Sequence, residues 1–206
     1  MAAQGFAMFD TAVGRCAIAW SARGITGVQL PERDDAATRA RLLKRNAGAR
    51  EAAPPPEVAQ TIDDIVALTR GERRDLSLIA LDMEGVPDFN RRVYEVARTI
   101  APGTTLTYGA IAKELGAPDA RGVGEALGQN PIPIIVPCHR VVAAGRKSGG
   151  FSAPGGVATK LRLLAIEGAR VEPAPERRRK APTARRRRDN DAAPTLFDFG
   201  GAAPDG

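Results

Sequence analysis

A short apolar segment interrupted by prolines constrains the fold of this chain more than any other feature. It reads NPIPIIVPCHRV and runs from Asn130 to Val141. Proline lacks a backbone N–H and has a fixed φ, so prolines spaced this closely fit neither a helix interior nor a central strand. The segment is therefore expected to be a stiff, buried connection that delivers Cys138 to a fixed position.

The residues that follow Cys138 suit a reactive thiol. His139 and Arg140 place an imidazole and a guanidinium beside it, and His139 is the single histidine of the chain. A free cysteine has a pKa of roughly 8.5, and a neighbouring base or cation raises the thiolate fraction at neutral pH. A buried thiol next to a surface histidine is the alternative that this tripeptide alone leaves open.

The small number of cysteines limits the disulfides and metal sites that the chain could form. Cys16 and Cys138 are the two cysteines, which rules out a disulfide framework and suits a reducing compartment. Together with one histidine they are too few for a four-ligand Cys/His zinc site, so we predict no metal. No run approaches the roughly 18 consecutive apolar residues that a membrane span requires, and no signal sequence is evident. We expect a soluble, cytoplasmic protein without membrane association.

Charge is distributed unevenly along the chain, whose formal net charge is +6. Residues 1–88 hold 11 Lys/Arg against 13 Asp/Glu, residues 89–171 hold 11 against 5, and residues 172–206 hold 8 against 6. The basic surplus in the central segment predicts a face that binds a polyanion. Charge alone also fits a solvated surface without a partner.

Residues 1–86 are predicted to form a small α+β domain. Alternating apolar residues indicate a hairpin over 14–30 and a further strand over 76–83. Helices are expected over 34–46 and 57–70, where apolar residues recur on one face and a glycine follows. Cys16 and Trp20 fall on a strand face, where core packing is the expected role.

Residues 87–171 are predicted to form a mainly helical domain. An apolar stripe from Phe89 to Ile100 indicates one helix. Two shorter helices are expected at 108–115 and 119–128, with a Gly-Ala-Pro break between them and Asp119 as an N-cap. This spacing is typical of a helix-turn-helix, although paired short helices also occur in proteins that bind no DNA.

Residues 172–206 differ from both predicted domains in composition. Pro, Ala, Arg and Asp dominate, and basic blocks stand at 177–180 and 185–188. Such a segment buries too little apolar surface to form a core, so we predict a disordered basic tail.

The motif PCHRV at 137–141, preceded by Asn130-Pro131 and by Pro133, resembles the active-site motif of the O6-alkylguanine-DNA alkyltransferases, also called methylated-DNA–protein-cysteine methyltransferases. Further motifs match this family in the same order: TYGAIA at 107–112, ARGVG at 120–124, GFS at 150–152 and the segment 160–168. The resemblance is close over residues 89–168. The preceding residues match only in outline the family's ribonuclease-H-like domain.

The resemblance implies a DNA repair enzyme that moves the alkyl group of O6-alkylguanine irreversibly onto its own Cys138, in a single turnover. The implied partner is double-stranded DNA that contains O6-alkylguanine, with O4-alkylthymine as a second candidate substrate. His139 would act as the base through a bound water, and Glu167 would orient the histidine. No cofactor is called for, because the damaged base supplies the alkyl group. We expect the protein to be a monomer.

The resemblance also implies roles at the DNA. Tyr108 would donate a proton or hydrogen bond to N3 of guanine, and Arg121 would fill the place that the flipped nucleotide leaves. Asn130 would brace the turn before the cysteine segment. The further residues implied at the DNA are Thr107, Ala120, Gly124 and Arg140, and those implied around the substrate are Pro133, Val141, Phe151 and Ser152. Phe151 stands where many relatives have Tyr, which leaves the tolerance for bulky adducts open.

Two other classes of protein are alternatives. A non-catalytic helix-turn-helix protein would bind DNA as a regulator or a damage sensor, but relatives of the sensor kind lack the acceptor cysteine that is present here. A cysteine hydrolase would place its histidine far from the nucleophile in sequence, unlike Cys138 and His139.

A short apolar peptide stands near the C-terminus, at 194–199. It resembles the Leu-Phe peptides with which repair proteins dock on replication sliding clamps, although the usual leading Gln is missing. Leu196 and Phe197 are the candidate clamp contacts. A chance cluster, or a contact with the protein's own body, is the alternative.

Overall fold

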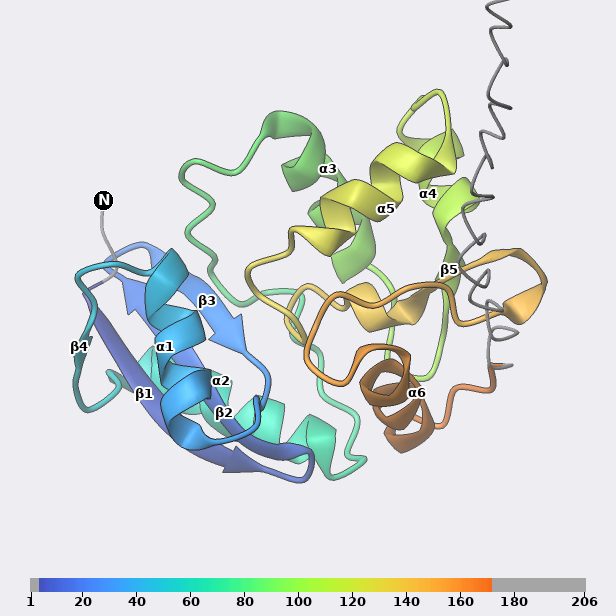
Figure 1. Cartoon of the computed structure of the whole chain (residues 1–206). Helices are drawn as coiled ribbons and strands as arrows, with labels where there is room; N and C mark the ends of the chain where they lie inside the picture. Colours follow the sequence, from blue (N-terminus) through green and yellow to red (C-terminus); the bar gives the residue numbers. More distant parts are fainter. Residues whose placement is uncertain (1–3, 172–206) are drawn as a thin grey trace, which may run out of the picture. The chain divides into compact units, whose positions relative to one another are not determined.

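A four-stranded sheet organises the N-terminal half of the computed structural model, which describes residues 4–171 (Figure 1). Its strands are β1 (Gly5–Thr11), β2 (Gly14–Ser21), β3 (Gly24–Gln29) and β4 (Arg50–Glu51), in the order β3-β2-β1-β4. The β1–β2 and β2–β3 pairs are antiparallel, and β1 and β4 are parallel. The predicted hairpin at 14–30 is therefore confirmed as β2 and β3, while β1 was not predicted.

Helices α1 (Asp35–Arg45) and α2 (Pro56–Thr69) cover opposite faces of this sheet (Figure 1). Alternation along the strands divides the core between the two faces. Buried residues on the α1 side are Phe6, Ala17, Ala19 and Leu42. The α2 side includes Cys16, Ile18, Trp20, Ile65 and Leu68. Core packing of Cys16 and Trp20 is thus confirmed, as are the two predicted helices.

The strand predicted over 76–83 is wrong. In the structure this segment is mostly irregular, with a turn at 77–78 and one isolated bridge between Leu81 and Ile25. The Arg98 guanidinium donates to the carbonyl oxygens of Leu76, Ser77 and Ile79, and so occupies the acceptors that a neighbouring strand would need. Alternating apolar residues do not reveal that a side chain, rather than a neighbouring strand, donates the hydrogen bonds to these backbone carbonyl groups.

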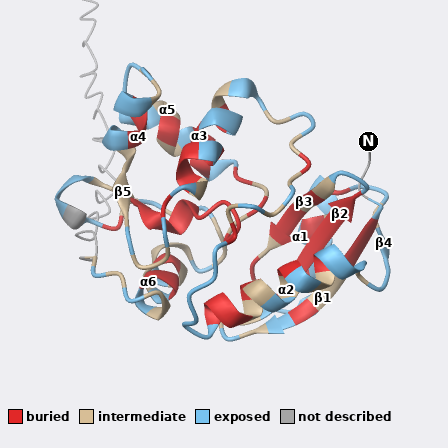
Figure 2. Ribbon diagram, turned by 180° about the vertical axis from the view of Figure 1, so that it is seen from behind, coloured by how far each residue is buried: buried red, intermediate tan, exposed pale blue. Residues whose placement is uncertain are grey.

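Short helices dominate the second half of the described chain. They are α3 (Asp88–Arg98), α4 (Tyr108–Glu114), α5 (Ala120–Gly128) and α6 (Gly156–Ile166), and the inward faces of α3 and α5 are buried (Figure 2). β5 (Leu106–Thr107) and β6 (Val141–Val142) form a short parallel pair. One-turn 3-10 helices stand at η1 (Cys138–Arg140) and η2 (Ala144–Arg146). The three helices predicted between 89 and 128 are confirmed.

The chain therefore has a mixed α+β fold whose two halves share one apolar core. A backbone hydrogen bond from Val28 N to Pro131 O, of 3.0 Å, joins β3 to the proline-rich segment. The predicted boundary between residues 86 and 87 stays a prediction. No helix within residues 4–171 is long and apolar enough to cross a membrane. The predicted tail and its Leu-Phe peptide lie outside the described residues.

Candidate active site

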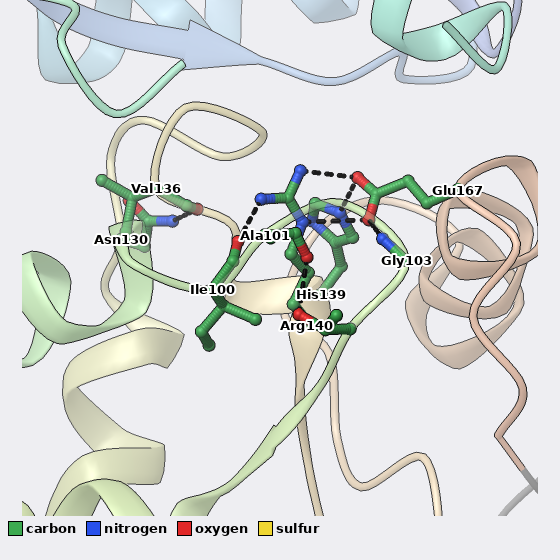
Figure 3. Close-up of polar contacts among 9 residues, drawn as sticks. Ile100, Ala101, Gly103, Asn130, Val136, His139, Arg140 and Glu167 are labelled. Atoms are coloured by element: carbon green, nitrogen blue, oxygen red, sulfur yellow. Dashed lines mark hydrogen bonds and ion pairs between the residues drawn. The ribbon is translucent and has the colours of Figure 1, made fainter. Parts of the chain in front are cut away.

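The proline-rich segment is held in one conformation by Asn130. The Asn130 side chain donates to Val136 O at 2.9 Å (Figure 3). It also accepts from Ile132 N at 2.9 Å. Ile134 has a φ of 75°, in the left-handed region that a β-branched residue rarely adopts. Such strain persists only where surrounding contacts over-determine it. The predicted bracing role of Asn130 agrees with these contacts.

Cys138 is buried at the first residue of η1. Burial raises the pKa of its thiol above the usual value, against the opposing effects of the Asn130 hydrogen bond and the charge of Lys160. A thiol with a raised pKa is protonated at neutral pH, so it needs a base before it can act as a nucleophile. Cys16 also has a raised thiol pKa, of about 11, but it is fully buried on β2, where its thiol contacts Thr11 Oγ1 and Gly14 O rather than a base.

A base is available at the next residue, His139. Its Nε2 lies 2.9 Å from Oε1 of Glu167, and its Nδ1 is buried without a hydrogen-bond partner in the described part of the chain. Burial lowers the pKa of the imidazole, against the raising effect of Glu167, so the resting ring is neutral. A neutral ring that donates Nε2–H to Glu167 keeps its free lone pair on Nδ1, which can then accept a proton.

Glu167 is the centre of the polar network drawn in Figure 3. Besides His139, it accepts from Arg140 through Nε at 2.9 Å and NH2 at 2.8 Å, and from Gly103 N at 3.3 Å. Burial would raise the pKa of this carboxyl group, but the hydrogen bonds from His139 and Arg140 bring it to about 2. Glu167 is therefore ionised at any physiological pH.

Arg140 lies in this network rather than on a surface that faces DNA. Its side chain is only 6% exposed, and NH1 donates to Ile100 O at 2.6 Å. Its burial and these partners hold the guanidinium inside the network around Glu167. We therefore reassign Arg140 from the predicted DNA contacts to the support of Glu167, because a buried carboxylate needs a compensating charge.

Lys160 is a site residue to which the sequence analysis assigned no role. Its Nζ is buried and donates to Val141 O at 2.5 Å, to Gly150 O at 3.3 Å and to Tyr108 Oη at 3.4 Å. Burial lowers its pKa to about 8, and Cys138 is the group whose charge opposes that shift. No ion pair joins Lys160 to a carboxylate within residues 4–171. The sequence did contain a signal for such a role, because Lys160 is the one charged residue on the buried side of α6, beside Leu163 and Leu164.

A hollow on the surface opens above Cys138, and we call it the substrate hollow. Its walls include most of the residues that the sequence implied at the substrate and the DNA, which are Tyr108, Ala120, Arg121, Gly124, Phe151 and Ser152. Val141 is fully buried beneath it, and Pro133 lines a neighbouring hollow instead. Burial raises the pKa of the Tyr108 phenol to about 12, so it is a proton donor at neutral pH.

A side chain caps the N-terminus of each of the helices α4 and α5. Thr107 Oγ1 accepts from Ala110 N at 3.0 Å, and Asp119 Oδ1 accepts from Arg121 N at 2.9 Å. The Arg121 side chain is 84% exposed and pairs with Glu125 at 3.0 Å. An exposed pair one helical turn apart contributes little stability, so Arg121 is free to leave it.

Comparison with known proteins agrees with this geometry. Residues 88–169 match the family model described as the DNA binding domain of 6-O-methylguanine DNA methyltransferase. The methylated-DNA–protein-cysteine methyltransferase of Methanothermobacter thermautotrophicus is 37% identical over 122 residues, which are 59% of this chain and 68% of that protein. That of Mycolicibacterium paratuberculosis is 39% identical over 145 residues, 70% of this chain and 74% of the relative. The chain belongs to the methylated-DNA–protein-cysteine methyltransferase family.

Solved structures of methyltransferases share the fold of this chain. Mycobacterium tuberculosis OGT in complex with DNA has a TM-score of 0.64 and 33% identity, over 80% of this chain and 92% of that one. The O6-methylguanine-DNA methyltransferase of Pyrococcus kodakaraensis has a TM-score of 0.61 and 30% identity, over 80% of this chain and 99% of the other. This methyltransferase accordingly repairs DNA by transferring an alkyl group to a cysteine.

Proposed function

We propose that Cys138 receives the alkyl group of O6-alkylguanine in double-stranded DNA, irreversibly and once per molecule. The observation that carries the proposal is the juxtaposition of a buried thiol at the floor of the substrate hollow with a neutral His139 whose Nδ1 is unpaired. The other described cysteine, Cys16, is buried in the core, where its thiol contacts Thr11 Oγ1 and Gly14 O.

The first step is the removal of the thiol proton. His139 Nδ1 accepts it through a bridging water, and the imidazolium that forms is stabilised by Glu167, as in a nucleophile–base–orienter triad. The imidazolium balances the new thiolate and Arg140 balances Glu167, so this proton transfer leaves the net charge of the site unchanged. Lys160 adds a further positive charge near the thiolate, since its protonated Nζ is the other buried cation at this site.

The second step is an in-line displacement at the alkyl carbon. The S–C bond forms as the O6–C bond breaks, and the electron pair of the broken bond stays on the guanine. Tyr108 donates a proton to the guanine ring, and Lys160 Nζ, 3.4 Å from the phenol oxygen, replaces it. The charges balance, because the site begins with a lysine cation and ends with a histidine cation. A thioether is not cleaved under these conditions, so no second turnover follows.

DNA reaches this site through α4 and α5, which we propose act as a helix-turn-helix. Thr107, Ala120 and Gly124 would lie against the phosphate backbone, and Arg121 would enter the base stack when the damaged nucleotide rotates into the substrate hollow. The N-terminal sheet with its two helices would be the family's ribonuclease-H-like domain. We propose further that the protein acts as a monomer in the cytoplasm.

The C-terminal residues would recruit the protein rather than catalyse. Eight Lys/Arg in 172–206 can neutralise phosphates without reading sequence. Leu196 and Phe197 would dock on a replication sliding clamp, a proposal that rests on the sequence motif alone.

A labelled substrate tests the proposed function directly. Duplex DNA with O6-methylguanine labelled in its methyl group is incubated with the protein, and the label is located by peptide mass. We expect close to one equivalent on Cys138, and none on a Cys138→Ala variant that still binds DNA. Label on Cys16, or turnover beyond one equivalent, would refute the mechanism.

A further inference from the structure

Cys138 borders a second hollow besides the substrate hollow. This side hollow lies between the proline-rich segment and the N-terminal half of the chain, and its walls include Leu30, Arg41, Arg45, Asn130, Pro133 and Pro154. Residues of β3 and α1, whose function the alkyl transfer does not explain, therefore approach the acceptor thiol. The N-terminal half therefore forms part of the surroundings of Cys138.

Only a thin wall separates the two hollows. Leu127, Gly128, Cys138 and Ser152 line both of them. Within this wall Ser152 Oγ donates a hydrogen bond of 3.0 Å to Gly128 O. Ser152 and Gly128 are both exposed, so this bond contributes little and can open for a substituent that extends past Cys138.

The charge of the side hollow is positive. Arg41 and Arg45 are the ionisable side chains in its lining apart from Cys138 itself, and no carboxylate is among the lining residues. Arg41 is held through Nε by Glu32 at 3.2 Å, which leaves its two terminal nitrogens for a ligand. Arg45 NH1 donates to Asn130 O at 3.3 Å and so holds its guanidinium at the wall.

The geometry of the displacement determines which part of an O6 substituent could enter the side hollow. Sulfur, carbon and leaving oxygen must be collinear, so the rest of an alkyl group projects sideways from the reacting carbon. A methyl group has no heavy atom beyond the reacting carbon. A longer substituent extends beyond that carbon, and the side hollow is a neighbouring space that Cys138 also borders.

We propose that the side hollow binds the distal end of O6 substituents that carry a carboxylate, with Arg41 and Arg45 as its anion-binding residues. The inference rests on the proposed function, because it requires Cys138 to be the acceptor. Carboxymethyl is the shortest such group. Its CH2 forms the bond to sulfur and loses the bond to O6, while the carboxylate is unchanged and pairs with a guanidinium.

The test compares two adducts of nearly the same shape in the same duplex. O6-carboxymethylguanine is anionic and O6-carbamoylmethylguanine is neutral, so the ratio of their single-turnover rates measures the charge preference. We expect the wild-type ratio to exceed one. Arg41→Gln should lower it by about fivefold, since an exposed ion pair is worth up to about 1 kcal/mol. Arg41→Glu should favour the neutral adduct.

Arg39→Gln is the matched control. Arg39 lies on the same helix, pairs with Glu51 at 2.9 Å and is not part of the side hollow, so its replacement should leave the ratio as in the wild type. The combined Arg41→Gln and Arg45→Gln variant should lower the ratio further than Arg41→Gln alone.

Two results would overturn the proposal. A ratio that the combined variant does not change would mean that the arginines do not meet the substituent. Equal slowing of both adducts in duplex DNA, with no slowing of the free modified bases, would mean that they bind DNA phosphates instead. Failure of the proposed function looks different, because O6-methylguanine would then leave no label on Cys138.

Discussion

Arg140 donates two hydrogen bonds to Glu167, from Nε at 2.9 Å and from NH2 at 2.8 Å, and both side chains are almost fully buried. The carboxylate that orients His139 is thus already neutralised by its neighbour in space. As a result, Glu167 holds the imidazole in place without drawing a permanent proton onto it, and the ring stays neutral and able to act as a base.

The first prediction concerns the pH dependence of stability. The folded-state pKa of Glu167 is about 2, below its usual value of 4.5. Its stabilising contribution is therefore complete above about pH 4.5 and is lost as the pH falls towards 2, by about 3 kcal/mol in all. Urea unfolding of Glu167→Gln at several pH values should show a correspondingly smaller acid destabilisation, and its alkyl transfer should be slower. Glu114→Gln, at an exposed position, should behave as the wild type.

The second prediction separates base flipping from chemistry. Arg121→Ala should slow repair of duplex DNA far more than reaction with free O6-methylguanine, because unstacking costs a few kcal/mol that the arginine offsets. Glu125→Ala, which removes the exposed partner of Arg121, should leave both reactions nearly unchanged. Single-turnover rates on the two substrates give the comparison. An equal loss on both would assign Arg121 to the fold.

The third prediction concerns the proton that Lys160 supplies. Its pKa of about 8 lies below the usual 10.5, so the cation is present below pH 8 and is lost as the pH rises through that value. The wild-type transfer rate should decline over this range, and Lys160→Met should be slow at every pH without that decline. Rates measured from about pH 6 to about 10, with the exposed Lys44→Met as control, test it. A wild-type decline that persists in Lys160→Met would contradict it.

The fourth prediction concerns residues beyond 171. A chain truncated after Val171 should still transfer the alkyl group to Cys138 at high DNA concentration. Its DNA affinity should fall, and the dependence of affinity on salt should be shallower, because fewer phosphates are neutralised. Complete loss of transfer would show that these residues belong to the folded core. Clamp binding, if the motif provides it, should disappear from the full chain carrying Leu196→Ala and Phe197→Ala.

The helices and the reactive segment could be predicted because their signals are local. Asp34 and Asp119 cap helices where the sequence places them, and the spaced prolines do fix Cys138 in a buried turn. The position of Arg140 could not be predicted in this way. The family resemblance implied a contact with DNA, whereas its partners Glu167 and Ile100 are distant along the chain.

Long-range partners also explain the other differences. The segment from Leu76 to Met83 has the pattern of a strand, but Arg98 from α3 donates to three of its carbonyl groups. Lys160 looks like one more charged residue on a helix until Tyr108 and Val141 are seen beside it. Patterns in sequence report periodicity and charge, and they do not report which distant group satisfies a donor.

The hydrogen bond from Val28 N to Pro131 O joins segments that are synthesised at different times. β3, which contains Val28, leaves the ribosome long before Pro131 does. Glu167, whose carboxylate orients His139, is synthesised later still. A nascent chain that has exposed Cys138 therefore still lacks the partner of its base. Under the proposed mechanism, we expect the thiol to stay unreactive until the residues through Glu167 have been synthesised, which would keep a single-use nucleophile from reacting before it reaches DNA.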